Sequence, residues 1–459
     1  MNANAPLAIA TILSVVLSSA GTSATLAADA PAVQLKVGVA NPTMLAETQA
    51  INHVRIALDG IQPTEQRLRA PVNVTLVIDR SGSMQGHKIE QAKQAAIAAV
   101  QRLNDQDIVS VVLYNAGVEV LVPSTKATDR ATIIQKIQSI RAGGGTALFA
   151  GVSRGAAEVR KFLRDDSVNR VILLSDGHAN VGPSSPGDLE SLGRSLIKEG
   201  ISVSTLGLGA SYNEDLMSQL ASAASGNHVF VEDADYLVEV FNREFDDLMS
   251  VIANSVEIRV DLGAGVRPVR VLNTHARIEG RRVQIPLAQL YAGQQRYFIV
   301  EVEVDAKAAK RPLPLADVTV AFNDLIRDRA AKLHDRVSVH FSTSPDEVSR
   351  ATDWETKAFC SVQIITERNR EATAMRDAGQ VQQAKQLLED NAKELRVLAV
   401  KCKDNNVLVV VPELVRNSDA NTLQALNIED DRNWSRSRKV MREYQNAVEQ
   451  QQTYSAPNR

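Results

Sequence analysis

The sequence predicts an α/β protein in which a doubly wound, mostly parallel sheet is inserted in a β-sandwich-like module and followed by an α-helical hairpin. Three observations predict this architecture. Strand and helix patterns alternate from residue 72 to about residue 250, which is typical of a parallel sheet covered by helices. Residues 254–342 show alternating strand patterns without long helices. Residues 350–404 contain two stretches with apolar residues at helical spacing.

The chain has 459 residues, more than a single domain usually holds. Two short strand patterns, at 33–37 and 54–58, have no sheet of their own, and we expect them to complete the β module on either side of the inserted domain. The predicted divisions are a signal peptide (1–30), leading strands of the β module (31–70), the α/β domain (71–253), the main part of the β module (254–342), the helical hairpin (350–404) and a C-terminal tail (405–459).

Composition and targeting signals narrow the class of protein. With 51 basic and 54 acidic residues the charge is nearly balanced, so nothing indicates binding to nucleic acid. The apolar stretch 7–20 is too short to span a bilayer easily and is followed by cleavage points after Ala27 or Ala30, which is typical of a secretory signal. No Lys or Arg precedes Lys36, so an uncleaved anchor is the alternative. No later segment could span a membrane, and we expect an exported protein of the periplasm or cell surface.

The α/β domain can be divided into elements in chain order. The strand 118–122 follows a hairpin-sized link and is expected to be an antiparallel edge strand. The predicted strands are 72–78, 107–114, 118–122, 170–175, 201–208 and 228–232, and the predicted helices are 89–103, 128–141, 147–163, 187–199, 213–224 and 234–250.

One stretch of this domain has the chemistry of a metal site. The wholly apolar strand 72–78 ends in Asp79, and Ser81 and Ser83 follow at alternate positions, so three oxygens can point to one side. Carboxylate and hydroxyl oxygens are hard ligands that suit magnesium, calcium or manganese.

The D-x-S-x-S pattern after a buried strand resembles the opening motif of the von Willebrand factor type A (VWA) domain. The metal-ion-dependent adhesion site (MIDAS) of that family needs two further residues, for which Thr146 in the sequence GGGT and Asp176 in VILLSDG are the candidates. The segments RAPVNV, DRSGSMQG, SDGHANVGP and GLGASYNEDLM also resemble exported bacterial VWA proteins that are likened to calcium-activated chloride channel proteins and inter-alpha-trypsin-inhibitor heavy chains. The resemblance implies a Rossmann-like fold and a metal site made of Asp79, Ser81, Ser83, Thr146 and Asp176.

The same resemblance implies a function in binding. We expect Mg²⁺ at this site, with Ca²⁺ or Mn²⁺ as alternatives, and a partner protein that supplies an Asp or Glu carboxylate. The channel label does not carry over, because a chain without a membrane span cannot itself form a pore.

Two other classes of function remain open. A metal-dependent hydrolase is disfavoured because the sequence lacks H-E-x-x-H, G-x-x-x-x-G-K-[ST], G-x-S-x-G and a second acidic metal cluster, although His178 could be imagined as a general base. His228 is interpreted as a strand residue, and Glu214 and Asp215 as first-turn acids of a helix capped by Asn213. A structural scaffold without metal dependence is the third class.

The C-terminal third carries weaker signals. The hairpin is interpreted as a packing element, with a single peptide-binding helical repeat as the alternative. Cys360 and Cys402 lie on its two helices, and we expect them to form a disulfide that joins them. The cations Arg432, Arg436, Arg438, Lys439 and Arg442 are interpreted as a solvated helix face, with contact to acidic lipid or protein as the alternative.

Overall fold

The central element is a six-stranded sheet with the order β6-β5-β4-β7-β8-β9. The computed structural model describes residues 31–62, 69–177, 180–209, 211–307 and 312–451. All pairings in this sheet are parallel except that of β6, which lies antiparallel at the edge as predicted. The strands are β4 (Val72–Asp79), β5 (Ile108–Tyr114), β6 (Val118–Lys126), β7 (Val168–Ser175), β8 (Ser202–Leu208) and β9 (His228–Val231).

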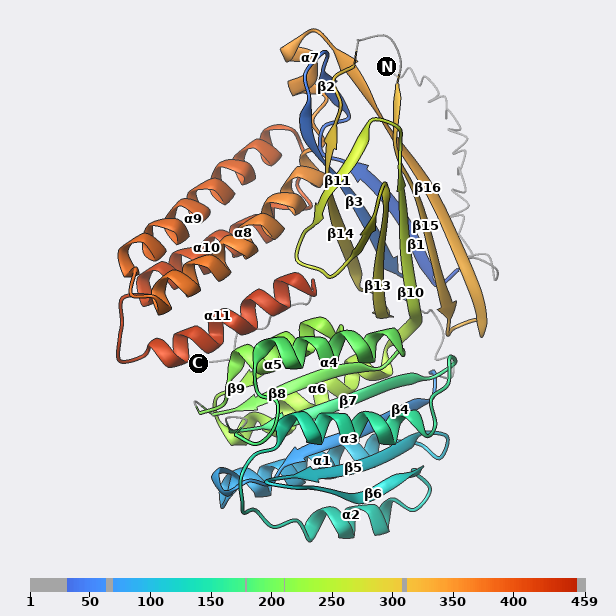
Figure 1. Ribbon diagram of the computed structural model, residues 1–459, viewed down its shortest axis with the longest axis vertical. Coiled ribbons are helices and arrows are strands. Elements are labelled where there is room, and N and C mark those ends of the chain that lie inside the picture. Colours follow the sequence, from blue (N-terminus) through green and yellow to red (C-terminus); the bar gives the residue numbers. More distant parts are fainter. Residues whose placement is uncertain (1–30, 63–68, 178–179, 210, 308–311, 452–459) are drawn as a thin grey trace, which may run out of the picture. The chain divides into compact units, whose positions relative to one another are not determined.

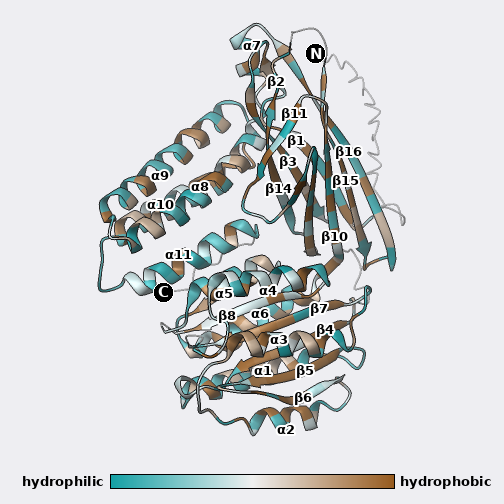
Figure 2. Cartoon of the chain, in the orientation of Figure 1, coloured by the Kyte–Doolittle hydropathy of each residue, from teal (hydrophilic) through white to brown (hydrophobic). Residues whose placement is uncertain are grey.

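Helices cover both faces of this sheet (Figure 1). One apolar core joins the sheet to α1 (His87–Arg102), α2 (Arg130–Gln138) and α6 (Leu237–Met249). A second core joins it to α3 (Leu148–Arg160), α4 (Pro186–Lys198) and α5 (Glu214–Ala223). Every residue of β4 is buried, and the central strands are coloured largely as hydrophobic in Figure 2. This burial on both faces explains why the strand sequences read as continuous apolar runs.

The order in which successive strands are added to the sheet reverses between the parallel neighbours β4 and β7. From β4 the chain builds β5 and β6 on one side, and from β7 it builds β8 and β9 on the other. Open α/β sheets form a crevice at such a point, beyond the carboxyl ends of the two strands. The loops that follow β4 and β7 therefore meet there.

The β module consists of two further sheets, with the orders β1-β3-β14-β11 and β12-β13-β10-β15-β16-β2. The leading strands β1 and β3 do complete it, because β3 pairs with β14 along its whole length. One apolar core contains side chains from both sheets. The bounds are β1 (Val33–Val39), β2 (Thr43–Leu45), β3 (Ala50–Gly60), β10 (Val251–Leu262), β11 (Val266–Val271), β12 (Arg277–Glu279), β13 (Arg282–Tyr291), β14 (Gln295–Val304), β15 (Leu313–Asp324) and β16 (Arg329–Ser342).

The C-terminal region is more helical than predicted. The predicted hairpin is present as α8 (Trp354–Asp377) and α9 (Val381–Asp404), with a break at Gly379, whose φ of +81° is one that favours glycine. It packs on the β module through an apolar cluster that includes Tyr297 and Phe359, as a packing element would. A short helix, α7 (Pro345–Arg350), precedes it, and the tail forms α10 (Val411–Asn427) and α11 (Trp434–Glu449).

The interpretation of the tail cations as a solvated helix face was wrong for Arg438, Lys439 and Arg442, whereas Arg432 and Arg436 are exposed as predicted. Arg438 and Lys439 pair with Glu214 at 2.6 Å, and Arg438 and Arg442 pair with Asp215 at 2.6 and 2.9 Å. Asn213 does cap α5, as predicted, by accepting hydrogen bonds from backbone N–H groups of its first turn. The acids of that turn thus attract α11 to the α/β domain in addition to complementing the helix dipole.

The predicted disulfide is also wrong, since Cys360 and Cys402 are both free and buried. The Cys402 Sγ lies 3.8 Å from the carbonyl oxygen of Trp354, which precedes Cys360 by six positions on α8. Six positions correspond to about 9 Å along a helix, and this offset places the two sulfurs at different heights of the hairpin.

Among the described residues no helix has both the length and the hydrophobicity needed to cross a membrane. The predicted signal segment 1–30 lies outside the described residues.

Candidate metal centre

Asp79 is the last residue of β4 and is fully buried. Its Oδ1 accepts a hydrogen bond of 2.8 Å from the backbone N–H of Ser81, and its Oδ2 accepts one of 2.7 Å from the Ser175 hydroxyl. Burial raises the pKa of this carboxyl, and the neighbouring Asp176 raises it further, whereas the bonds from Ser81 and Ser175 oppose the rise. A positive charge at this position would offset the unfavourable burial of the ionised carboxylate.

The two motif serines connect Asp79 to Asp176. The Ser81 and Ser83 hydroxyls lie 3.1 Å apart, and the Ser83 hydroxyl donates a 2.7 Å hydrogen bond to Asp176 Oδ1. Ser81 is buried, whereas Ser83 is exposed, so the group opens to solvent on the Ser83 side. Met84, fully buried at the end of a 3₁₀ turn, fixes this loop on the core beneath it.

Thr146 is brought to the same place by hydrogen bonds between loops. The N–H of Gly82 donates to the carbonyl of Gly144 at 3.0 Å, and the N–H of Gly143 donates to the carbonyl of Arg80 at 2.7 Å. These bonds join the loop after β4 to the loop before α3, so Thr146, which is 4% exposed, lies beside the serines.

Gly177, the residue after Asp176, shows how closely the loops converge. A Cβ atom on this glycine would lie 3.3 Å from Thr146 Oγ1, 3.6 Å from Ser83 Oγ and 3.7 Å from Asp79 Oδ2. Two oxygens from the end of β4 and its following loop and one from the loop before α3 thus surround one point, and a side chain there would fill the space between them. The structure brings all five predicted residues together.

The donor set fits a divalent cation. It consists of two carboxylates and three hydroxyls, and all of these are hard oxygen ligands of the kind that Mg²⁺, Ca²⁺ and Mn²⁺ prefer.

Lys88, in the first turn of α1, supplies a cation of the chain's own. Its Nζ lies 2.5 Å from Asp176 Oδ2, and its side chain is 32% exposed. The ammonium is therefore bonded to a carboxylate oxygen that a bound metal ion would otherwise coordinate. Lys88 was not predicted from the sequence as a residue of the site. It lies only five residues after Ser83, in a helix that starts at His87, and this closeness to the motif was the available signal.

Two other residues of the site were missed. Ser175 bonds to Asp79, as described above, and Asn180 accepts a 2.9 Å hydrogen bond from the N–H of Thr146 through its side-chain oxygen. Ser175 directly precedes Asp176 and Asn180 follows it by four positions. Both could have been found as polar residues close in sequence to a predicted ligand. His178, considered above as a general base, lies outside the described residues.

His228 is a strand residue, as predicted. It begins β9, is 3% exposed, and its ring nitrogen lies 2.9 Å from the Thr205 hydroxyl. Burial lowers the pKa of its imidazole to about 4, so the ring is neutral near pH 7.

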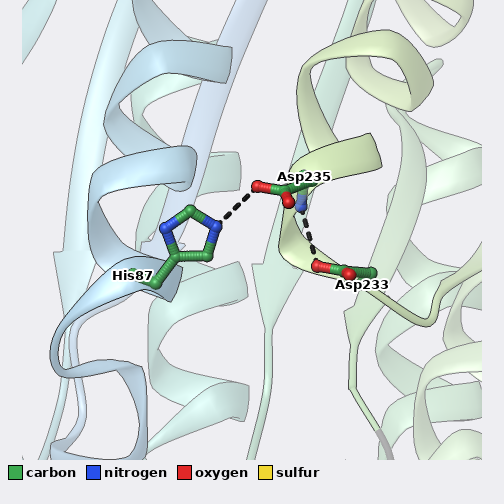
Figure 3. A group of neighbouring side chains, drawn as sticks. All are labelled: His87, Asp233 and Asp235. Carbon is green, nitrogen blue, oxygen red and sulfur yellow. Dashed lines mark hydrogen bonds and ion pairs between the residues drawn. The ribbon is translucent and has the colours of Figure 1, made fainter.

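A second group of potential ligands lies near the start of α1. His87, Asp233 and Asp235 place one ligand atom each within 4.8 Å of one another, and all three are exposed (Figure 3). The contacts have simpler roles: His87 and Asp235 form a surface pair of 2.6 Å, and Asp233 caps the following 3₁₀ turn. The fold thus joins exposed residues from segments that are distant in sequence, and the expectation of no second acidic metal cluster stays a prediction.

The fold and the loop geometry define a class, an α/β domain with a cluster of oxygen-bearing side chains at its switch point. The family model of the von Willebrand factor type A domain matches residues 73–243. This part of the chain is a VWA domain, and domains of this type generally mediate interactions between proteins.

The chain also matches several curated relatives, each over only part of its length. The chain is 27% identical over 262 residues to an uncharacterized protein of Synechocystis sp., covering 55% of this chain and 61% of that protein. It is 28% identical to the uncharacterized protein YfbK of Escherichia coli over 41% of this chain and 33% of that protein. It is 30% identical to human inter-alpha-trypsin inhibitor heavy chain H3 over 38% of this chain and 21% of that protein. The chain therefore spans less than two thirds of each of these relatives.

Two solved structures share more of the architecture. A von Willebrand factor type A protein from Catenulispora acidiphila superposes with a TM-score of 0.68 at 18% identity, over 84% of this chain and 90% of that one. The ArnB paralog VWA2 from Sulfolobus acidocaldarius gives 0.63 at 18% identity, over 89% and 98%. The similarity shows that the flanking β and helical regions belong to a recurrent fold together with the VWA domain.

Proposed function

We propose that this chain is a metal-dependent adhesion or assembly module, not an enzyme, that binds a partner protein through the Asp79 site. The convergence of five oxygen-bearing side chains, three of them around Gly177 and two joined to these by hydrogen bonds, at an edge that opens to solvent beside Ser83, carries the proposal. Asp79, Ser81, Ser83, Thr146 and Asp176 would hold the ion, expected to be Mg²⁺, with Ca²⁺ or Mn²⁺ as alternatives.

The charge balance of the site supports carboxylate binding. Two aspartates roughly neutralise a divalent cation, and among the described residues no third carboxylate bonds to the motif serines. A bound cation would supply an open coordination position to an Asp or Glu side chain of the partner, whereas a third fixed carboxylate would remove that attraction. Thr146 and the serines are neutral, so they orient an ion without adding charge.

The surroundings of the two motif serines, among the residues that the structure describes, support binding over hydrolysis. The Ser81 and Ser83 hydroxyls bond to each other, the Ser83 hydroxyl donates to Asp176, and among the described residues no histidine contacts either hydroxyl. A serine nucleophile needs an adjacent base. We further propose, from the apolar segment 7–20, that the protein is exported to the periplasm or cell surface.

The test is partner capture from the native envelope by the full chain. Wild type should capture its partner in Mg²⁺ but not in excess chelator, and Asp79→Ala and Thr146→Ala should not capture it in either. Thr132→Ala changes an exposed threonine of α2 outside the site and should behave as wild type. All variants must first be shown to be folded.

Two outcomes would contradict the proposal. Capture that is indifferent to metal and to Asp79→Ala would favour the scaffold alternative, with the interaction on the β module or the helices. Turnover of a substrate that is lost with Asp79→Ala would favour the metal-dependent hydrolase.

A further inference from the structure

A cavity of about 720 Å³ lies where α4, α5, α8 and α11 meet β13 and β14. It is separate from the metal centre, because none of the five predicted ligands lines it. Its volume falls in the range of small-molecule sites, roughly 300–1,000 Å³. Many of the side chains that line it are polar or charged.

Arg296, on β14, is the unusual lining residue. It is 6% exposed, and among the described residues its one side-chain hydrogen bond runs from Nη1 to the neutral Gln450 Oε1 at 2.7 Å. Its Nε is buried without a partner, and its guanidinium carbon lies 5.8 Å from the centre of the Phe298 ring. Burial lowers its pKa to about 10, so the group is still charged near pH 7.

Arg55 shows how the same sheet treats a buried arginine with a structural role. It lies on β3, the neighbour of β14, and is 2% exposed. It pairs with Glu355 at 2.9 Å and hydrogen-bonds to Gln295 at 2.7 Å. Because an isolated buried charge is unfavourable, buried arginines normally have such a partner. Arg296 has no acidic partner among the described residues.

The acids of the cavity wall do not compensate this charge, because most are paired with other cations. These pairs are Glu190–Arg194, Asp215–Arg442, Glu367–Arg270 and Glu449–Arg370. Glu371 lines the cavity too but is exposed. Two of these cations, Arg370 and Arg442, line the cavity as well. The wall thus combines one buried, unmatched guanidinium with carboxylates that are mostly paired.

We propose that this cavity binds a small molecule with one carboxylate, which pairs with the Arg296 guanidinium. Arginine suits a planar carboxylate, and a single unmatched guanidinium balances one negative charge but not the several charges of a ligand such as phosphate. The rest of the ligand should be neutral or cationic, as in an amino acid. This site is independent of the metal centre, and it adds a small-molecule function to a chain proposed above to bind a protein.

The test uses thermal melts of the full chain in sodium glutamate, acetate, inorganic phosphate and chloride at matched ionic strength. Wild type should show a saturable rise in Tm with glutamate or acetate, of roughly 2–4 °C over chloride. Arg296→Met should lose this rise, and Arg296→Lys should keep part of it. Arg55→Met, the matched control, should melt lower in every salt but keep the carboxylate response. Comparing variants in one salt removes the general stabilisation that some anions give all proteins.

Arg296→Met in chloride gives a second readout. It should melt at or above wild type, because it removes an uncompensated buried charge and keeps an apolar side chain of similar length. A purely structural arginine would instead give a lower Tm. The proposal is overturned if wild type shows no carboxylate response, if it responds to phosphate alone, or if Arg296→Met responds like wild type. The wild-type and Arg296→Lys melts decide the matter even if Arg296→Met does not fold.

Discussion

Replacing Lys88 by methionine should tighten Mg²⁺ binding at the metal centre. The Lys88 ammonium bonds at 2.5 Å to Asp176 Oδ2, and the Asp176 carboxylate is fully buried. A cation that uses this carboxylate must first displace the ammonium and then tolerate its charge nearby. Methionine keeps the length and apolar stem of the side chain but removes the competing charge.

The magnitude follows from the contact that the ion must break. A hydrogen bond between charged groups contributes about 1.5–3 kcal/mol. Because the Lys88 side chain is 32% exposed, the lower end of that range applies, and solvent screens part of the charge. Since 1.4 kcal/mol corresponds to about a factor of ten, the Kd for Mg²⁺ should fall about tenfold. The ion-free variant should lose about 1.5 kcal/mol of stability, because Asp176 is then buried without a counter-charge.

Calorimetric titration gives the affinity, and thermal melts with and without Mg²⁺ give the stability. The variant should melt below wild type in chelator and approach or exceed it in excess Mg²⁺. The control is Lys93→Met on the same helix, since the Lys93 side chain is 8% exposed and pairs with Glu90 at 2.8 Å. An unchanged or weaker Mg²⁺ affinity in Lys88→Met would refute the reasoning.

Three further predictions concern the C-terminal helices. Lys439→Met should lower the free energy of unfolding by about 3 kcal/mol, because it leaves Glu214 partly unpaired in a buried site, and urea denaturation that finds no loss would contradict this. Burial raises the pKa of Glu443 from 4.5 to about 8, so its contribution is full below about pH 4.5 and is lost as the pH rises toward 8. Glu443→Gln should therefore gain stability over wild type between pH 5 and pH 8.5, and a pH-independent difference would argue against a raised pKa. Alkylation of the unfolded, unreduced chain should label both Cys360 and Cys402, and mass spectrometry that finds neither labelled would restore the disulfide.

The sequence predicted the parts of the fold that depend on local pattern. The central strands of the VWA domain were found because each is apolar on both faces, and the site residues because each follows such a strand or precedes a helix. The exposed edge strand β6 was found from the hairpin-sized link before it. Strand β16 was missed, because exposed and half-buried residues alternate along most of it and it offers little apolar signal. The long-range contacts of the site, such as Lys88 with Asp176, depend on side-chain positions that no local pattern specifies.

The tail cations show a different limit. A run of Arg and Lys usually indicates a solvated face, and this interpretation was reasonable for α11 taken alone. The partners of Lys439 and Arg438 lie more than two hundred positions earlier in the chain, on α5. Only the packing of α11 on α5 and β9 brings them together, and it turns a surface charge pattern into a set of largely buried ion pairs.

Titration calorimetry of Mg²⁺ into the wild-type chain tests most directly whether Asp79, Ser81, Ser83, Thr146 and Asp176 form one cation site. We expect a single site, and at a hundredfold excess over its Kd a stabilisation of about 2.7 kcal/mol that appears as a higher Tm. Asp79→Ala and Thr146→Ala should abolish or strongly weaken the binding, whereas Thr132→Ala should leave it unchanged. No heat of binding in wild type, together with equal melting temperatures in Mg²⁺ and in chelator, would contradict the proposed site.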